Sequence, residues 1–508
     1  MLLLFYFIPY IILTMGKSVA IIGAGISGLT AGIYLRKAGF KVTILEKHTI
    51  AGGLCTYWER KGMRIDGCIH WMTGTKPTSL TYLRWKEVGA LHNQKEIIYL
   101  PTWGVVDFHG TKVPFYCDLD KAEKAWINIS KDDTKMIKKF FKMVRKIASV
   151  DLPIEDPIRY MSLKTKLKFV KDIIRTFPYY TKGMKISCEE YAAKFKHPAI
   201  RNAIVNIQPG EGNLYSMMYC YATVACGNGG IPTGGSKTVI DNMVDKFKSI
   251  RGKILVDSEV TKIEVEGKNV SGLRLYNGEL VKADYYLACC DSCYTMINLL
   301  DNKYQHKKIM QRYLDPVTHP APSCVFINYA VDASIEIPVP YIFNVPSFKI
   351  ANKTINHLNI RNYNYDNTQI RNGKSVLQVL IDQDSNDYEW WVKLYKRKNE
   401  YLSFKEKIAQ IVLELIVKQV PEYKENIFLL DVATPITFNR YTNASRGSFM
   451  SFLFNKKKGV IMTKGKLKGL NNFLLSGQYV QTPGGLPLAL ASGKYSATYI
   501  KKMAKVRG

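Results

Sequence analysis

The stretch "VAIIGAGISGLTAGIYLRKAGFKVTILE", residues 19–46, decides the fold of the N-terminal part of this chain. An apolar strand is followed by Gly23, Gly25 and Gly28 in the spacing G-x-G-x-x-G, then by a helix and a second strand that ends at Glu46. Gly23 permits a tight turn, Gly25 lets a pyrophosphate approach the backbone, and Gly28 lets helix and strand pack closely. This order predicts a dinucleotide-binding unit in which Glu46 accepts hydrogen bonds from a ribose.

The loop after this second strand contains two adjacent glycines, in the sequence "EKHTIAGGLCTYW" (residues 46–58). Because Gly52 and Gly53 lack Cβ, the loop can pass close against a bulky, extended ligand, although an ordinary turn uses the same residues. The glycine pair therefore favours a large dinucleotide without identifying it.

The residues of this loop, followed by "RIDGCIHW" (64–71), resemble the FAD-binding start of the amine-oxidase-like flavoproteins. Within that superfamily the chain is most similar to the branch of phytoene desaturases, carotenoid isomerases and retinol saturases. Three later blocks resemble further segments of this branch, in the same order: "IPTGGSKTVIDNMVDKFKSIRGKILVDSEVTKIEVEGKNVSGLRL" (231–275), "TPITFNRYTNASRGSF" (434–449) and "NFLLSGQYVQTPGGLPLALASGKYSATYI" (472–500). The four blocks cover under half of the chain, and their shared order makes the resemblance more specific than any single block.

The resemblance implies that the dinucleotide is FAD. The glycine pair would pass along its pyrophosphate and ribityl chain, Val260 would contact the adenine through its backbone, and the C-terminal block would close over the flavin. Because no cysteine follows Cys324, that block offers no thiol for the thioether that some amine oxidases form there, and we expect FAD to be non-covalent. The predicted FAD-binding residues are Gly23, Gly25, Gly28, Glu46, Lys47, Gly52, Gly53, Leu54, Val260, Gly477 and Leu486.

The resemblance also implies an α/β fold, with a discontinuous Rossmann-like FAD-binding domain interleaved with an α+β substrate domain. In the second insertion, strand-like runs such as "SCVFINYAVD" and "KSVLQVLI" precede the helical pattern "FKEKIAQIVLELIVKQV". The predicted parts are an apolar N-terminal segment (1–14), FAD-binding parts at 15–76, 226–300 and 431–508, a helical and basic part of the substrate domain at 77–225, and its second part at 301–430.

Two residues near the expected flavin ring are candidates for catalysis. His70 follows the turn at Asp66 and Gly67, where the chain should approach the isoalloxazine, and Arg440 lies in the block "TPITFNR". Side chains at both positions can also serve only packing or a solvated salt bridge. A flavin needs little acid or base help to move a hydride, so the lack of a catalytic triad excludes nothing.

The leading interpretation is an FAD-dependent oxidoreductase that acts on a conjugated polyene or a related hydrophobic lipid, by desaturation, saturation or isomerisation. The direction depends on the electron donor or acceptor, for which NAD(P)H is one candidate. A second interpretation is an amine or porphyrinogen oxidase on the same FAD framework. A third, from another class, is a flavin-stabilised lipid-binding protein without turnover.

The composition favours anionic partners. The 508 residues include 72 basic and 42 acidic ones, a net charge of +30, which fits membrane surfaces or polyphosphate cofactors. The chain has no zinc-finger spacing and no RNA-binding aromatic motif, so nucleic acid is not expected as a partner. Ten cysteines without a regular framework fit a reducing compartment; Cys290 and Cys293 form a C-x-x-C without a second ligand pair, and no metal is expected.

Membrane contact is expected at two places, as in a cytoplasmic protein that binds membranes peripherally. The run "MLLLFYFIPYIIL" is uncharged but too short to cross a bilayer, so either translation begins at Met15 or the segment dips into one leaflet. Residues 161–177 have the pattern of an interfacial helix, although a helix packed on the core with a solvated lysine face has the same pattern. The apolar positions are Leu163, Leu167, Val170, Ile174 and Phe177, and the basic ones are Lys164, Lys168, Lys171 and Arg175.

Overall fold

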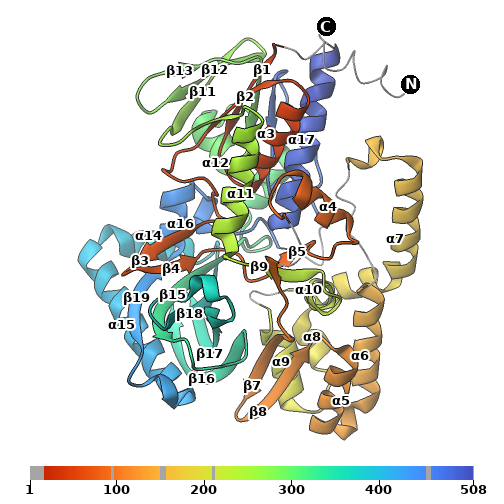
Figure 1. Ribbon diagram of the computed structural model, residues 1–508, viewed down its shortest axis with the longest axis vertical. Helices are drawn as coiled ribbons and strands as arrows, with labels where there is room; N and C mark the ends of the chain where they lie inside the picture. The colour runs from red at the N-terminus through yellow and green to blue at the C-terminus, as the bar shows by residue number, and fades with distance from the viewer. Residues whose placement is uncertain (1–15, 93–95, 149–155, 209–211, 454–458, 507–508) are drawn as a thin grey trace.

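The computed structural model describes residues 16–92, 96–148, 156–208, 212–453 and 459–506. Their strands form two large sheets, one toward the top of Figure 1 and the other below it, with a helical unit to one side. The predicted apolar segment 1–14 and the alternative start at Met15 lie outside the described residues.

A five-stranded parallel sheet contains the two strands that flank the glycine motif. All of its strand pairs are parallel, and such sheets are buried on both faces. This Rossmann-like arrangement confirms the predicted α/β fold class. The strand order is β10 (Lys253–Leu255), β2 (Lys41–Leu45), β1 (Ser18–Ile22), β14 (Tyr285–Ala288) and β20 (Phe473–Leu475).

Three helices cover one face of this sheet, and a small antiparallel sheet with two short helices covers the other. Helix packing is close because glycine lies at the contact: a Cβ on Gly493 would lie 2.4 Å from the carbonyl oxygen of Ser27. The first face carries α3 (Ile26–Lys37), α11 (Gly235–Ser249) and α17 (Leu486–Val506); the second carries β11 (Val260–Glu266), β12 (Asn269–Leu275), β13 (Leu280–Val281), α12 (Ser292–Tyr294) and α13 (Lys307–Tyr313).

The second large sheet has seven strands and is antiparallel except where β16 pairs with β7. Its side chains alternate, as expected for a sheet with two different faces. On one face Val325 and Ile360 pack against α14 (Tyr388–Lys396) and α15 (Lys398–Gln419). The strand order is β19 (Phe428–Ala433), β15 (Pro322–Asp332), β18 (Lys374–Asp384), β17 (Lys353–Asn362), β16 (Tyr341–Ile350), β7 (Thr102–Phe108) and β8 (Thr111–Tyr116).

The helical unit is built around a buried aromatic cluster that includes Trp126, Phe140, Phe141 and Tyr221. Its longest helix, α7, contacts α10 and α6 and stands along the side of the molecule in Figure 1. Across the described residues, every helix falls short of the length and apolar character that a bilayer crossing requires. The unit comprises α5 (Leu119–Ile129), α6 (Thr134–Ile147), α7 (Leu163–Met184), α8 (Cys188–Ala192), α9 (Pro198–Asn206) and α10 (Leu214–Ala225).

Shorter elements connect these three parts, and one of them, α16, follows directly on the second sheet. They are β3 (Tyr57–Arg60), β4 (Met63–Asp66), β5 (Met72–Thr73), α4 (Leu80–Glu87), β6 (Ile97–Ile98), β9 (Gly229–Pro232) and α16 (Pro435–Thr442).

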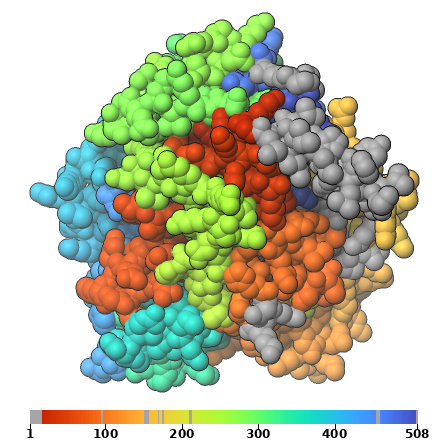
Figure 2. Space-filling model, turned by 45° about the horizontal axis from the view of Figure 1, so that its top comes forward, coloured from red at the N-terminus to blue at the C-terminus, as the bar shows by residue number. Residues whose placement is uncertain are grey.

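The parallel sheet draws strands from all three segments predicted for the FAD-binding domain, namely 15–76, 226–300 and 431–508. Figure 2 shows the consequence at the surface, where the red N-terminal segment lies next to green segments from the middle of the chain. One predicted boundary is wrong. Strand β19 runs across residue 430 and pairs with β15, because Val432 completes the core of the second sheet.

Candidate active site

A cavity of about 710 Å³ lies where the carboxyl ends of the parallel strands face the second sheet. Ile22 ends β1, Leu45 ends β2, Cys289 and Gly477 follow β14 and β20, and all four line the cavity. Ligands of open α/β sheets bind outside the carboxyl ends of the strands. The same cavity continues past Phe326 of β15 to residues of α10. One space therefore joins the predicted dinucleotide site to the second sheet and the helical unit.

Gly23 and Gly28 have the backbone roles that their spacing predicts. Gly23 has a φ of +97°, and a Cβ on Gly28 would lie 2.0 Å from the Gly23 carbonyl oxygen. Helix α3 can therefore begin directly against the end of β1, and Ile26 and Ser27 of its first turn line the cavity. Amides at such a helix start favour a phosphate group.

The second glycine pair lets one loop lie on the other. The Gly52 amide donates to the Ala24 carbonyl oxygen at 3.0 Å, and a Cβ on Gly52, whose φ is +131°, would lie 2.4 Å from the Cys55 carbonyl oxygen. Gly53 packs beside Gly25: a Cβ added at Gly53 would lie 3.5 Å from the Cα of Gly25. The pair is therefore more than an ordinary turn, since it holds two cavity-lining loops in backbone contact.

Glu46 is buried and fixed by backbone amides. Its Oε2 accepts from the Ala24 amide at 2.7 Å, and its Oε1 accepts from the His48 amide at 3.0 Å. Burial raises the pKa of this carboxyl, and the two amide hydrogen bonds act in the opposite direction. The carboxylate lines the cavity while it also ties the first glycine loop to β2. The sequence predicted Glu46 as an acceptor for a ribose, and this link to the first glycine loop was not predicted.

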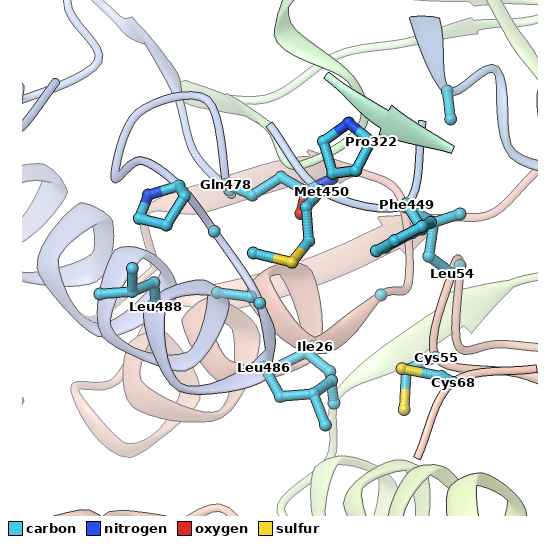
Figure 3. Close-up of a pocket in the computed structure, with 18 of the residues that line it drawn as sticks. Ile26, Leu54, Cys55, Cys68, Pro322, Phe449, Met450, Gln478, Leu486 and Leu488 are labelled. Carbon is cyan, nitrogen blue, oxygen red and sulfur yellow. The ribbon is translucent and has the colours of Figure 1, made fainter. Parts of the chain in front are cut away.

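The other predicted cofactor residues gather at the same end of the cavity. All of them line it except Gly28, which lies behind the loop. Lys47 is held there by Asn443, whose Oδ1 accepts from Nζ at 2.7 Å, and by an ion pair with Glu259 at 3.3 Å. Figure 3 shows the apolar part of the lining, with Ile26 and Leu486 on one side of the space and Met450 opposite them.

His70 lies where the cavity meets the second sheet. Its Nε2 is 3.1 Å from Oε1 of Gln378, an oxygen that also accepts from the Tyr363 hydroxyl at 3.1 Å. Since that oxygen only accepts, Nε2 carries the hydrogen of this bond. Removal from water, and then the charge of Arg361, lowers the pKa of His70 to about 3. The ring is therefore neutral near pH 7 and cannot act as a cationic acid.

This burial of a neutral histidine predicts acid sensitivity. In the unfolded chain His70 titrates near 6.5, so between pH 6.5 and about 3 the unfolded state binds a proton that the folded state does not. Stability is therefore lost as the pH falls through this window. His70→Gln should reduce the drop in melting temperature between pH 7 and pH 5, whereas His92→Gln, at an exposed position, should not. Equal drops in all three proteins would contradict the neutral, buried ring.

The catalytic prediction for Arg440 is wrong in this structure. The side chain is exposed, and its guanidinium lies 4.8 Å from the Tyr441 ring centroid, outside the cavity lining. Helix α16 presents Phe438, Thr442 and Asn443 to the cavity instead. Arg440 lies on a different face of that helix from these residues, and it contributes only its carbonyl oxygen, which accepts from Lys47 at 3.2 Å.

Sequence reasoning missed the polar residues that the second sheet brings to His70. Gln378 of β18 donates to the Asp66 carbonyl oxygen and to Oδ1 of Asn328, both at 3.0 Å. Arg361 of β17 donates to the His70 carbonyl oxygen at 3.3 Å. The alternation of polar and apolar residues in "NHLNIRN" (356–362) was the only signal, and it does not reveal which loop the polar face meets.

Several proteins of known name are similar to this chain in sequence. A family model described as an NAD(P)-binding Rossmann-like domain matches residues 21–84. The chain is 25% identical to the lycopene-forming phytoene desaturase of Paracoccus sp., over 56% of each chain. It is 25% identical to the prolycopene isomerase of Daucus carota, over 87% of this chain and 73% of the relative. It is 22% identical to the all-trans-retinol 13,14-reductase of Danio rerio, over 84% and 76%.

Solved structures share the fold over almost the whole chain. An oxidoreductase from Methanosarcina mazei has a TM-score of 0.55 at 16% identity, covering 96% of this chain and 100% of that one. A putative protoporphyrinogen oxidase from Exiguobacterium sp. has a TM-score of 0.51 at 15% identity, covering 96% and 99%. The resemblance drawn from the motifs is thus confirmed: the relatives are named as a desaturase, an isomerase and a reductase, and the solved structures share the fold.

Proposed function

We propose that this chain, whose relatives include phytoene desaturases and prolycopene isomerases, is an FAD-dependent oxidoreductase of polyenes or related hydrophobic lipids. The observation that carries the proposal is the single cavity that runs from the glycine loops to an apolar chamber. Bound FAD would supply hydride transfer, and the chain would position the lipid and exclude water. The chamber is lined by Trp71, Trp103, Ile207, Tyr219, Phe326, Leu380 and Phe438.

Turnover is tested with both redox states of the protein. The FAD-loaded protein, either oxidised or reduced with dithionite, is mixed without oxygen with all-trans-retinol, all-trans-retinoic acid, phytoene or prolycopene, and followed by flavin absorbance and chromatography of the lipid. At least one polyene should reduce the oxidised flavin, reoxidise the reduced flavin or change the geometry of its double bonds. If every polyene binds and none is altered, the protein is the non-catalytic lipid binder instead. NADH and NADPH are compared as donors in the same assay.

An amine oxidase is the weaker alternative. A protonated amine would have to approach the buried guanidinium of Arg361, which lines the substrate end of the cavity beside His70. Like charges in a space of low dielectric repel strongly. A porphyrinogen carries carboxylates and escapes this objection, so it stays an alternative. Flavin bleaching by putrescine under anaerobic conditions would favour the amine oxidase.

We expect acid precipitation to leave the flavin in the supernatant, because the cofactor is non-covalent. Cys289 and Cys290 line the cavity, and burial raises the pKa of their thiols to about 12. They therefore remain protonated near pH 7, and a protonated thiol is a poor nucleophile for attack on a flavin. Flavin that stays with the precipitated protein would contradict this. A peptide map would then identify the attached residue.

A membrane surface is the proposed source of the lipid, and α7 is the proposed contact. Its predicted apolar stripe is not packed on the core: Leu163 is 74% exposed and Ile174 is 69% exposed. Tyr180 of the same helix lines the cavity and packs edge-on against Tyr215 of α10, with ring centroids 5.1 Å apart. A bilayer that covers the stripe would therefore lie next to one wall of the cavity.

The expected result is that the protein sediments with vesicles that contain phosphatidylserine and that four substitutions on α7 release it. Each basic residue near an anionic surface contributes about 1 kcal/mol to membrane binding. Sedimentation should therefore be abolished, without loss of FAD, when glutamine replaces the four basic residues Lys164, Lys168, Lys171 and Arg175. The matched control replaces the four exposed lysines of α6, whose apolar face is buried. These are Lys135, Lys138, Lys139 and Lys142. Equal sedimentation of the three proteins would remove α7 from membrane binding.

A further inference from the structure

The cavity contains a buried cation that its surroundings do not neutralise. Arg361 is 8% exposed and lies on β17, whose alternate residues Leu358 and Ile360 pack into the core of the second sheet. The period of two turns Asn359 and Arg361 to the opposite face, and both line the cavity. A charged side chain therefore lines the part of the cavity that the second sheet forms, beside apolar and neutral polar residues.

The groups that Arg361 contacts directly are neutral. Its Nη1 donates to the His70 carbonyl oxygen, and its charge acts on the Tyr365 hydroxyl. Within the described ranges no Asp or Glu forms an ion pair with it. Asp66, which also acts on Tyr365, forms its hydrogen bonds with the side chain and amide of Ser236 and no ion pair with Arg361. Asp366 likewise accepts from the Gly234 amide.

A buried charge without a counterion is costly, and proteins retain one where a ligand completes the pair. FAD carries its anionic groups on the pyrophosphate, which the glycine loops of the other sheet are predicted to hold. Arg361 belongs to the second sheet and faces the apolar chamber. The missing anion is therefore best supplied by the molecule that occupies this chamber.

We propose that Arg361 binds the carboxylate of the substrate, so that the substrate is a lipid acid with an apolar body rather than a neutral hydrocarbon. This inference rests on the proposed function, since it identifies the polar end of that substrate. The planar guanidinium can donate two parallel hydrogen bonds to a carboxylate, and the amide of Asn359 lies on the same strand face. The aromatic lining receives the apolar body.

The test compares two probes with the same carbon skeleton, all-trans-retinoic acid and all-trans-retinol. The FAD-loaded protein is titrated with each, and binding is followed by the flavin spectrum and by calorimetry. The acid should bind at least about 10-fold more tightly than the alcohol. Arg361→Met should lose about 10- to 100-fold in affinity for the acid and little for the alcohol, and Arg361→Lys should retain part of the preference.

Two further measurements separate binding from structure. Without ligand, Arg361→Met should melt at a higher temperature than the parent, because it removes an unpaired buried charge. Arg371→Met, at an exposed position outside the cavity, should leave both affinities unchanged.

Equal affinity of the parent for the two probes, or a preference that survives in Arg361→Met, would overturn the assignment while leaving the polyene proposal in place. Loss of FAD from Arg361→Met would show that Arg361 contributes to FAD binding rather than to substrate binding. If the parent binds neither probe, the proposed function fails together with the substrate carboxylate.

Discussion

Glu46→Lys will leave the purified protein without FAD. The substitution removes the carboxylate that accepts from the Ala24 and His48 amides and places a positive charge in a buried position at the end of β2. Each buried amide left without its acceptor costs about 1–3 kcal/mol, and the loop that these amides hold also lines the predicted cofactor site, so we expect the affinity for FAD to fall by about two orders of magnitude or more. Flavin released by acid, measured per mole of protein, reports the result.

The melting temperature should fall with the flavin content. A ligand that binds only the folded state stabilises it by about 2.7 kcal/mol at a hundredfold excess over Kd, and the variant loses this contribution. Glu279→Lys makes the same change of charge at an exposed position and should retain FAD. Full flavin content in Glu46→Lys would remove Glu46 from the cofactor site.

Substitution of Gly52 by alanine should have the second large effect on FAD content and melting temperature, whereas the same substitution at Gly53 should have a small effect on stability. At Gly52 an alanine methyl would lie 2.4 Å from the Cys55 carbonyl oxygen, at a φ of +131° that alanine rarely adopts. The backbone strain alone costs about 1–3 kcal/mol, and the clash adds to it. We expect Gly52→Ala to lose most of its FAD and to melt much lower, because the loop must leave the Ala24 carbonyl.

Gly53→Ala is the matched control from the adjacent position. Its φ of +60° is left-handed, which costs alanine about 1–2 kcal/mol, but the nearest atom to the new methyl is 3.5 Å away. Without flavin, this variant should melt only slightly lower than the parent. Similar melting temperatures of the two variants without flavin would contradict the backbone contact at Gly52 as the reason for the pair.

Local chemistry explains how much the sequence could predict. The glycine loop, Glu46 and the strands around them lie within one short stretch, where spacing alone determines the geometry. His70 came from the resemblance. Its neutral state could not be predicted, because the low pKa depends on burial against the second sheet and then on the charge of Arg361, about three hundred residues away on a strand whose register no local pattern gives.

Helix α7 shows a different limit of prediction from sequence. The spacing of Leu163 and Ile174 predicted an amphipathic helix over residues 161–177, and α7 forms there. The same pattern suits a helix packed on a core, and only the structure shows that both side chains are exposed. The prediction for Arg440 failed for a related reason: a motif can place a residue on a helix, but the rotation of that helix decides what the side chain faces.

The discontinuous parallel sheet also determines the order in which the protein can assemble on the ribosome. β1, α3 and β2 are synthesised first, but β14 pairs with β1 only after the first insertion, and β20 pairs with β14 only after the whole second sheet. Contacts between such distant segments form slowly and leave apolar strands exposed meanwhile. The parallel sheet can therefore be completed only when translation is nearly finished, and one side of β14 stays unpaired until then.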